Sequence, residues 1–154
     1  MRFMVAFSSP KRSARTVEAA ARQAKALGAE VVLLRVIPDA EKVGIVAQLI
    51  ATDRPVEKAQ EQINMVVGQL QGEGVKASGA VKVGEVGPGI VKAATEMEID
   101  MLFVGTMNFQ AKPRFLMARD PIVHYLVDHC PVNLVLIRQD EPSAAVIDAE
   151  EEGV

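Results

Sequence analysis

Two kinds of hydrophobic pattern alternate along the chain. In the first kind, a short run is apolar at nearly every position. Runs of this kind occupy residues 3–7, 31–36, 101–104 and 132–137. Strands that helices cover on both faces of a parallel sheet show this pattern, because neither face meets water. The segment 75–83 instead alternates apolar or small residues with polar ones, which predicts a half-exposed strand at a sheet edge.

The segments between these runs repeat their apolar residues every three or four positions, which is the helical period. Four helices are predicted. They cover residues 14–27 (ending before Gly28), residues 56–70, residues 90–97 after Gly87-Pro88-Gly89, and a segment that begins at Asp120-Pro121. Glycine commonly follows a helix, whereas Asp and Pro suit the cap and the first position of one. A weaker amphipathic stretch at 38–52 suggests a short extra helix.

Regular alternation of strands and helices predicts one α/β domain. Parallel strands need crossover connections, and these connections are right-handed. We therefore expect a three-layer, doubly wound, Rossmann-like open sheet of five parallel strands in the order 3-2-1-4-5, with helices on both faces. The domain is expected to span residues 1–138. Residues 139–154 change to an acidic composition, which predicts a disordered, solvated tail, with an acidic interaction tail as the alternative.

Composition narrows the possible partners. A net charge of −3, with 4% aromatic residues and no Trp, argues against nucleic acid as a partner. No apolar run is long enough to span a bilayer and no signal-peptide pattern is present, so a cytoplasmic protein without a membrane partner is expected. Cys130 is the only cysteine. His124 and His129 are five residues apart and have no accompanying carboxylate–histidine cluster, so no metal site is expected.

A ligand crevice is expected beyond the carboxyl ends of the first and fourth strands, where the strand order reverses. The loop after the first strand contains Ser8 and is followed by Lys11, Arg12 and Arg15. The segment 105–119 after the fourth strand is long for such a connection, and it contains Lys112, Arg114 and Arg119. These cations suggest either an anion-binding rim, formed chiefly by Lys112 and Arg114, or a solvated basic face without a ligand. No convincing catalytic constellation is present.

Several spaced features resemble the universal stress protein family. They are the strand 31–36 after Leu27-Gly28-Ala29, the stretch from Val83 to Ile90, the strand 101–104 ending at Gly105, and the closing segment 129–136. The resemblance covers nearly everything from Arg2 to Arg138. It implies a homodimer built partly through the last strand, Val132 to Ile137. That strand is apolar and lies at a predicted sheet edge, where it would otherwise be an aggregation hazard.

The resemblance also implies an ATP site at Ser8, Val36, Val104, Gly105, Asn108, Ala118 and Arg119. ATP-binding members carry Gly, two residues, Gly, nine residues, then Gly followed by Ser or Thr. Here Gly105 matches, but Asn108 and Ala118 replace the later glycines and Arg119 replaces the hydroxyl residue. Ser8 stands where the family has an acidic residue that would hold the ribose. The spacing is therefore kept while most identities are lost, and we expect ATP or another nucleotide to bind weakly or not at all.

These observations leave three functional hypotheses. The first is a stress-response or regulatory protein that acts through contacts with unidentified proteins, as a homodimer. The second is an ATP- or AMP-binding switch, or at most a slow ATPase, that uses the altered loop 105–119. The third is an adenylating or electron-transfer enzyme, which is disfavoured because Ser8-Ser9-Pro10 lacks the glycines of a phosphate loop after the first strand.

Overall fold

The computed structural model describes residues 1–39, 54–106 and 120–139, which contain five strands and four helices. In chain order these are β1 (Arg2–Ala6), α1 (Ala14–Leu27), β2 (Glu30–Ile37), α4 (Pro55–Gly72), β3 (Ala77–Val83), α5 (Val86–Glu96), β4 (Met101–Thr106), α6 (Pro121–His129) and β5 (Asn133–Arg138). All neighbouring strands pair in parallel, and their order is β3-β2-β1-β4-β5. The predicted fold class is therefore confirmed.

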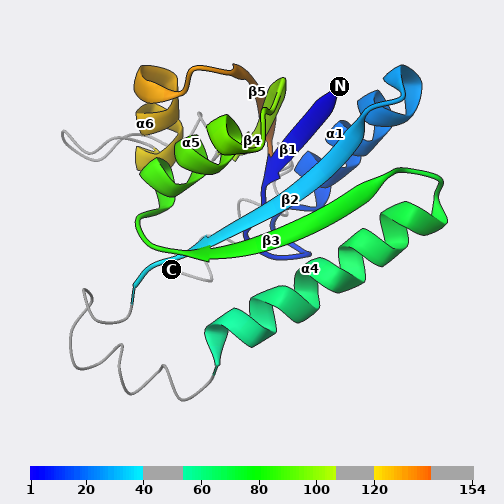
Figure 1. The fold of residues 1–154 in the computed structure, drawn as a ribbon, viewed down its shortest axis with the longest axis horizontal. Coiled ribbons are helices and arrows are strands. Elements are labelled where there is room, and N and C mark those ends of the chain that lie inside the picture. Colours follow the sequence, from blue (N-terminus) through cyan, green and yellow to red (C-terminus); the bar gives the residue numbers. More distant parts are fainter. Residues whose placement is uncertain (40–53, 107–119, 140–154) are drawn as a thin grey trace, which may run out of the picture.

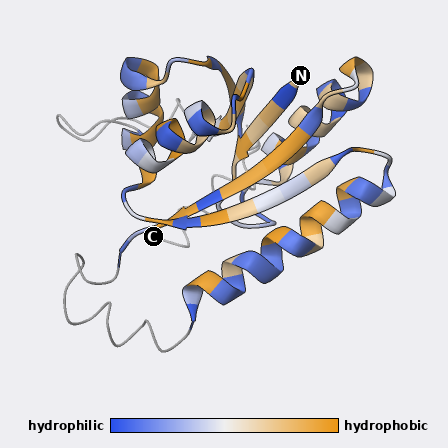
Figure 2. Ribbon diagram, in the orientation of Figure 1, coloured by the Kyte–Doolittle hydropathy of each residue, from blue (hydrophilic) through white to orange (hydrophobic). Residues whose placement is uncertain are grey.

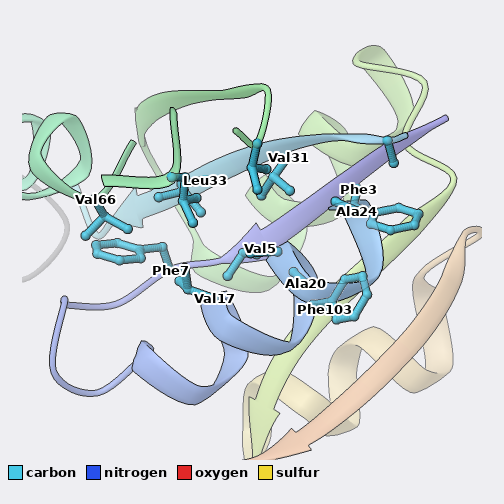
Figure 3. Close-up of a cluster of buried hydrophobic side chains, with 14 of the residues drawn as sticks. Phe3, Val5, Phe7, Val17, Ala20, Ala24, Val31, Leu33, Val66 and Phe103 are labelled. Carbon is cyan, nitrogen blue, oxygen red and sulfur yellow. The ribbon is translucent and has the colours of Figure 1, made fainter. Parts of the chain in front are cut away.

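Helices cover both faces of the sheet, with α1 and α4 on one face and α5 and α6 on the other (Figure 1). Successive side chains of a strand point to opposite faces. In β1, Phe3 and Val5 accordingly join the hydrophobic cluster under α1 and α4, whereas Met4 joins the cluster under α5 and α6. Figure 3 shows the first of these clusters, where the rings of Phe3 and Phe103 lie 5.4 Å apart between centroids.

The edge strand β3 differs from the strands at the centre of the sheet. Strand β2 is hydrophobic over most of its length, whereas β3 is paler and more polar (Figure 2). The alternating pattern thus correctly predicted β3 as a half-exposed edge strand. Its start was predicted two residues too early, because the Val75 N–H donates to the Leu70 carbonyl oxygen and Val75 closes the turn after α4.

The start of α5 was predicted wrongly. The helix begins at Val86 and includes Gly87-Pro88-Gly89, which the sequence analysis placed before it. Pro is tolerated there because N–H groups of the first helical turn have no acceptor inside the helix. The glycines allow close packing. A Cβ atom on Gly87 would lie 2.7 Å from the Tyr125 ring, and one on Gly89 would lie 3.0 Å from the Val36 side chain.

Other predicted boundaries agree within about two residues. Gly28 ends α1 in the left-handed conformation, with φ of 69°. Asp120 caps α6, and its Oδ1 accepts a hydrogen bond of 3.1 Å from the Val123 N–H. The predicted extra helix falls largely on residues 40–53, and the predicted tail falls, apart from Gln139, on residues 140–154. Both segments lie outside the described residues.

Candidate functional site

The turn between β1 and α1 is held by its own serines. The Ser8 N–H donates to Ser13 Oγ at 2.8 Å, and the hydroxyls of these two residues lie 3.1 Å apart. The Arg12 N–H donates to Ser9 Oγ at 3.1 Å. Ser13 is fully buried, so its hydroxyl holds the turn to the interior of the protein. These hydrogen bonds hold Ser8 and the backbone of Arg12 beside the carboxyl end of β1.

A crevice of about 440 Å³ lies at this end of the sheet. Residues from the carboxyl ends of β1, β2 and β4 line it, together with the first residues of α5 and α6. The loops that follow parallel strands all lie at the carboxyl edge of the sheet, and open α/β sheets bind their ligands there. The crevice has an apolar side formed by Val36, Val104, Ile90 and Ile122.

Four of the residues named from the sequence, Ser8, Val36, Val104 and Gly105, line this crevice together. The remaining candidates, Asn108, Lys112, Arg114, Ala118 and Arg119, lie outside the described residues. At Gly105, an added Cβ would overlap the side chain of Gln139, which also lines the crevice. A larger residue at position 105 would therefore displace Gln139.

The structure adds one cation that the sequence analysis did not single out. Arg35 is half-buried near the end of β2 and lines the crevice with Arg12. Burial lowers the pKa of Arg35, and the nearby positive charge of Arg12 lowers it further. The guanidinium nevertheless stays protonated at neutral pH, because arginine starts from a very high pKa. The signal in the sequence was a single charged residue inside the otherwise apolar run 31–37.

A second hollow of similar volume, about 430 Å³, lies between α1 and α4, away from the strand ends. Its lining includes Val17, Val66 and Leu70 with exposed charged residues at its margin. Of the β1–α1 turn only Pro10 contributes to it, and no residue at the starts of α5 and α6 does. The crevice at the strand ends is therefore the better candidate for a ligand site.

The structure also places the two histidines and the cysteine that the sequence analysis considered. His124 Nδ1 lies 3.6 Å from Asp128 Oδ2 on the exposed side of α6, and the ring of His129 lies 4.4 Å from that of Tyr125. Cys130 is half-buried and packs against the cluster under α5 and α6. Within residues 1–39, 54–106 and 120–139, no group of three or more His, Cys, Asp or Glu residues is placed to hold a metal ion. No helix in this part of the chain is long and apolar enough to cross a membrane.

Known structures with this architecture include three universal stress proteins. UspA from Lactobacillus plantarum superposes with a TM-score of 0.71 at 18% identity, covering 90% of this chain and 97% of that one. The Archaeoglobus fulgidus protein in complex with dAMP gives 0.67 at 18% identity, covering 90% and 98%. A family protein from Arabidopsis thaliana with AMP bound gives 0.64 at 16% identity, covering 94% and 97%.

At these identities the superpositions establish the fold and leave the ligand open. No curated protein is similar enough in sequence to count as a relative. The sequence model of the universal stress protein family, however, matches residues 1–138, which is most of the chain. Together with the parallel sheet and its strand order, this match shows that the chain belongs to the universal stress protein family.

Proposed function

We propose that this chain is a regulatory stress-response protein that binds ATP weakly or not at all and acts through protein contacts as a homodimer. The observation that carries the proposal is a crevice of about 440 Å³ that is retained at the strand ends, while the positions at which the family holds a triphosphate are mostly substituted. The apolar side formed by Val36, Val104 and Ile122 suits the face of a base.

The triphosphate is the part of ATP that the chain is least equipped to hold. Glycines let the backbone approach phosphates, and a hydroxyl at the following position can donate to them. Asn108, Ala118 and Arg119 occupy these positions here. Each lost hydrogen bond to a charged group costs roughly 1.5–3 kcal/mol, so several losses weaken binding by orders of magnitude. ATP is therefore expected to gain little over AMP.

Two of the similar structures support the choice of a nucleoside monophosphate as the probe, since one contains dAMP and another AMP. Calorimetric titration of nucleotide-free protein with AMP and with Mg-ATP tests the proposal. The expected result is weak binding of AMP and binding of Mg-ATP that is no tighter. Micromolar binding of Mg-ATP, much tighter than that of AMP, would overturn it.

Matched substitutions in α6 locate any binding. Ile122 lines the crevice, whereas Val127 lies on the same helix with 58% of its surface exposed. Ile122→Glu places a negative charge against the ligand and is expected to abolish AMP binding. Val127→Glu adds the same charge outside the crevice and is expected to leave binding unchanged. Equal effects of the two variants would show that the nucleotide binds elsewhere.

A second candidate function is a nucleotide-dependent switch, or at most a slow ATPase. The retained crevice and the basic residues Lys112, Arg114 and Arg119 in the following segment support it. These cations could attract a phosphate chain by charge in place of the glycine-rich backbone. Tight Mg-ATP binding that changes the sedimentation coefficient, or measurable release of phosphate from ATP, would place this function first.

A further inference from the structure

We propose that Ser8, Arg12 and Arg35 form an oxyanion site at the β1–β2 side of the crevice, which takes the phosphate group of a phosphate monoester. This inference deepens the proposed function, because it rests on the crevice binding a ligand and names the ligand's charged group. It moves the expected phosphate position away from segment 105–119 and toward the ends of β1 and β2.

The first support is an uncompensated pair of positive charges. Arg12 and Arg35 both line the crevice and are close enough for the charge of one to disfavour the charge of the other. Among the residues that the structure describes, no carboxylate forms an ion pair with either guanidinium. Like charges brought close together repel each other, and a bound anion offsets this repulsion through its attraction to both guanidinium groups.

The remaining charge in the described lining does not remove this bias. Asp120 is the acidic residue there, and its Oδ1 already accepts the Val123 N–H at the start of α6. A carboxylate at a helix N-terminus is partly neutralised by the positive end of the helix dipole. The described lining therefore carries two arginines against one helix-capping aspartate. This balance favours a ligand with a negative group.

The hydroxyl of Ser8 supplies a third polar group. Ser13 Oγ accepts the Ser8 N–H at 2.8 Å and lies 3.1 Å from Ser8 Oγ. A serine hydroxyl has one proton and two acceptor lone pairs. The Ser13 hydroxyl can therefore donate to Ser8 Oγ, which leaves the Ser8 proton free to donate to an anion in the crevice. An acidic side chain at position 8 would repel that anion, whereas Ser8 binds it.

Arginine suits this role because of its shape as well as its charge. The planar guanidinium has several N–H groups, and two of them can donate hydrogen bonds to two oxygens of one phosphate. Arg35 is held on a strand that pairs on both sides, with its partner Val81 on β3 in register. Its backbone is therefore fixed, so binding of a ligand orders only the side chain. Arg12 lies on an exposed turn and adds charge at the mouth of the crevice.

Titrations of the full chain with inorganic phosphate, AMP and adenosine test the site. We expect phosphate and AMP to bind and adenosine to bind more weakly than AMP. Arg35→Gln is expected to weaken AMP binding about tenfold or more, with no effect on adenosine. Arg12→Gln is expected to act in the same direction. Arg22→Gln is the matched control, because Arg22 is exposed on α1, pairs with Glu18 and lies outside the crevice.

The outcomes separate this inference from the proposed function. AMP binding that is unchanged in both Arg35→Gln and Arg12→Gln would overturn the oxyanion site and leave the nucleotide function standing. Phosphate binding that requires Arg35, without any binding of adenosine or AMP, would support the oxyanion site and count against a nucleotide ligand. Binding of neither phosphate nor AMP would overturn the oxyanion site and the crevice as a nucleotide site, and would leave only the part of the proposed function that rests on protein contacts. Because Arg12 lies on an exposed turn, its variant keeps the test valid if Arg35→Gln does not fold.

Discussion

Two glycines show how the same substitution has opposite effects at two positions. Gly79 lies in β3, where an added Cβ would overlap the side chain of the fully buried Ile63. Gly68 lies on the exposed side of α4, with no atom within 4 Å of an added Cβ. Gly79→Ala is expected to destabilise by about 1–3 kcal/mol because the core becomes overpacked. Gly68→Ala is expected to stabilise by roughly 0.5–1 kcal/mol because alanine favours the helix.

Urea unfolding of the two variants provides the measurement. The midpoint should fall for Gly79→Ala and rise for Gly68→Ala, with similar slopes. A rise for both variants would mean that Ile63 moves aside without cost. In that case the packing between α4 and β3 would be looser than the structure shows.

A charged pair at the opposite end of the sheet from the crevice predicts a pH dependence. The Arg2 side chain bonds Glu30 and also donates to the Met97 carbonyl oxygen at 2.6 Å. The hydrogen bond from Arg2 lowers the pKa of Glu30. A lowered carboxyl pKa stabilises the folded state above the ordinary pKa of a glutamate, and this stabilisation is lost as the pH falls through the lowered value. Because the pair is half-exposed, the effect is expected to be small.

Glu30→Gln removes this contribution. The stability that the protein loses between about pH 6 and about pH 2 should be smaller in Glu30→Gln than in the parent protein. Chemical denaturation at a series of pH values measures it. Glu61→Gln, at an exposed position of α4, should keep the parent's acid dependence. If both variants show the parent's dependence, the Arg2–Glu30 contact does not contribute in solution.

Single residues in the sequence predicted turns and helix caps well. They did not predict which residues from distant parts of the chain lie close together. Gly28 and Asp120 act within their own helix ends, so neighbouring sequence was sufficient to assign them. Arg35 gained significance only because β2 lies beside β1 and brings it near Arg12. The four site candidates that meet at the crevice were predicted from family resemblance, which carries such spatial information, whereas Arg35 has no place in the family pattern that the resemblance supplied.

At the scale of elements, the stability of α6 depends on the capping of its first turn. It has nine residues and begins with Pro121, so a side-chain cap matters more than in a long helix. Asp120→Ala removes the acceptor of the Val123 N–H and is expected to cost about 0.5–2 kcal/mol in unfolding free energy. Asp120→Ser retains a hydroxyl acceptor and should restore most of the loss. Thermal or urea unfolding of both variants measures this, and equal destabilisation by both would show that the cap itself is not the cause.

Element boundaries were harder to predict than element identity, for a physical reason. The start of α5 was misplaced because glycine and proline usually mark a turn, while here they form the first turn of a helix packed against Tyr125 and Val36. Tertiary packing decided the outcome there. By contrast, the central strands β1, β2 and β4 were predicted within about two residues, since their continuous hydrophobicity reflects burial on both faces. The same pattern was misleading for β5, which lies at the sheet edge and has no fully buried residue among those described.

At the scale of the whole molecule, the sheet has two edge strands, and substitutions in each of them test the proposed dimer. Strand β5 forms one edge and has Leu136 with 43% of its surface exposed; β3 forms the other and has Val83 with 56% exposed. Charged residues on an edge strand oppose association with another chain. If the homodimer forms through β5, Leu136→Lys should shift the protein toward a monomer, whereas Val83→Lys should leave the dimer intact.

Sedimentation equilibrium at micromolar concentration distinguishes these outcomes. The parent protein and Val83→Lys should have about twice the chain mass of 16.6 kDa, and Leu136→Lys should approach the chain mass. Dissociation by Val83→Lys instead would assign the interface to β3. A parent protein that is already a monodisperse monomer would contradict the dimer itself. It would leave the exposed apolar residues of β5 as a surface for a different protein, because nothing in the described fold covers that edge.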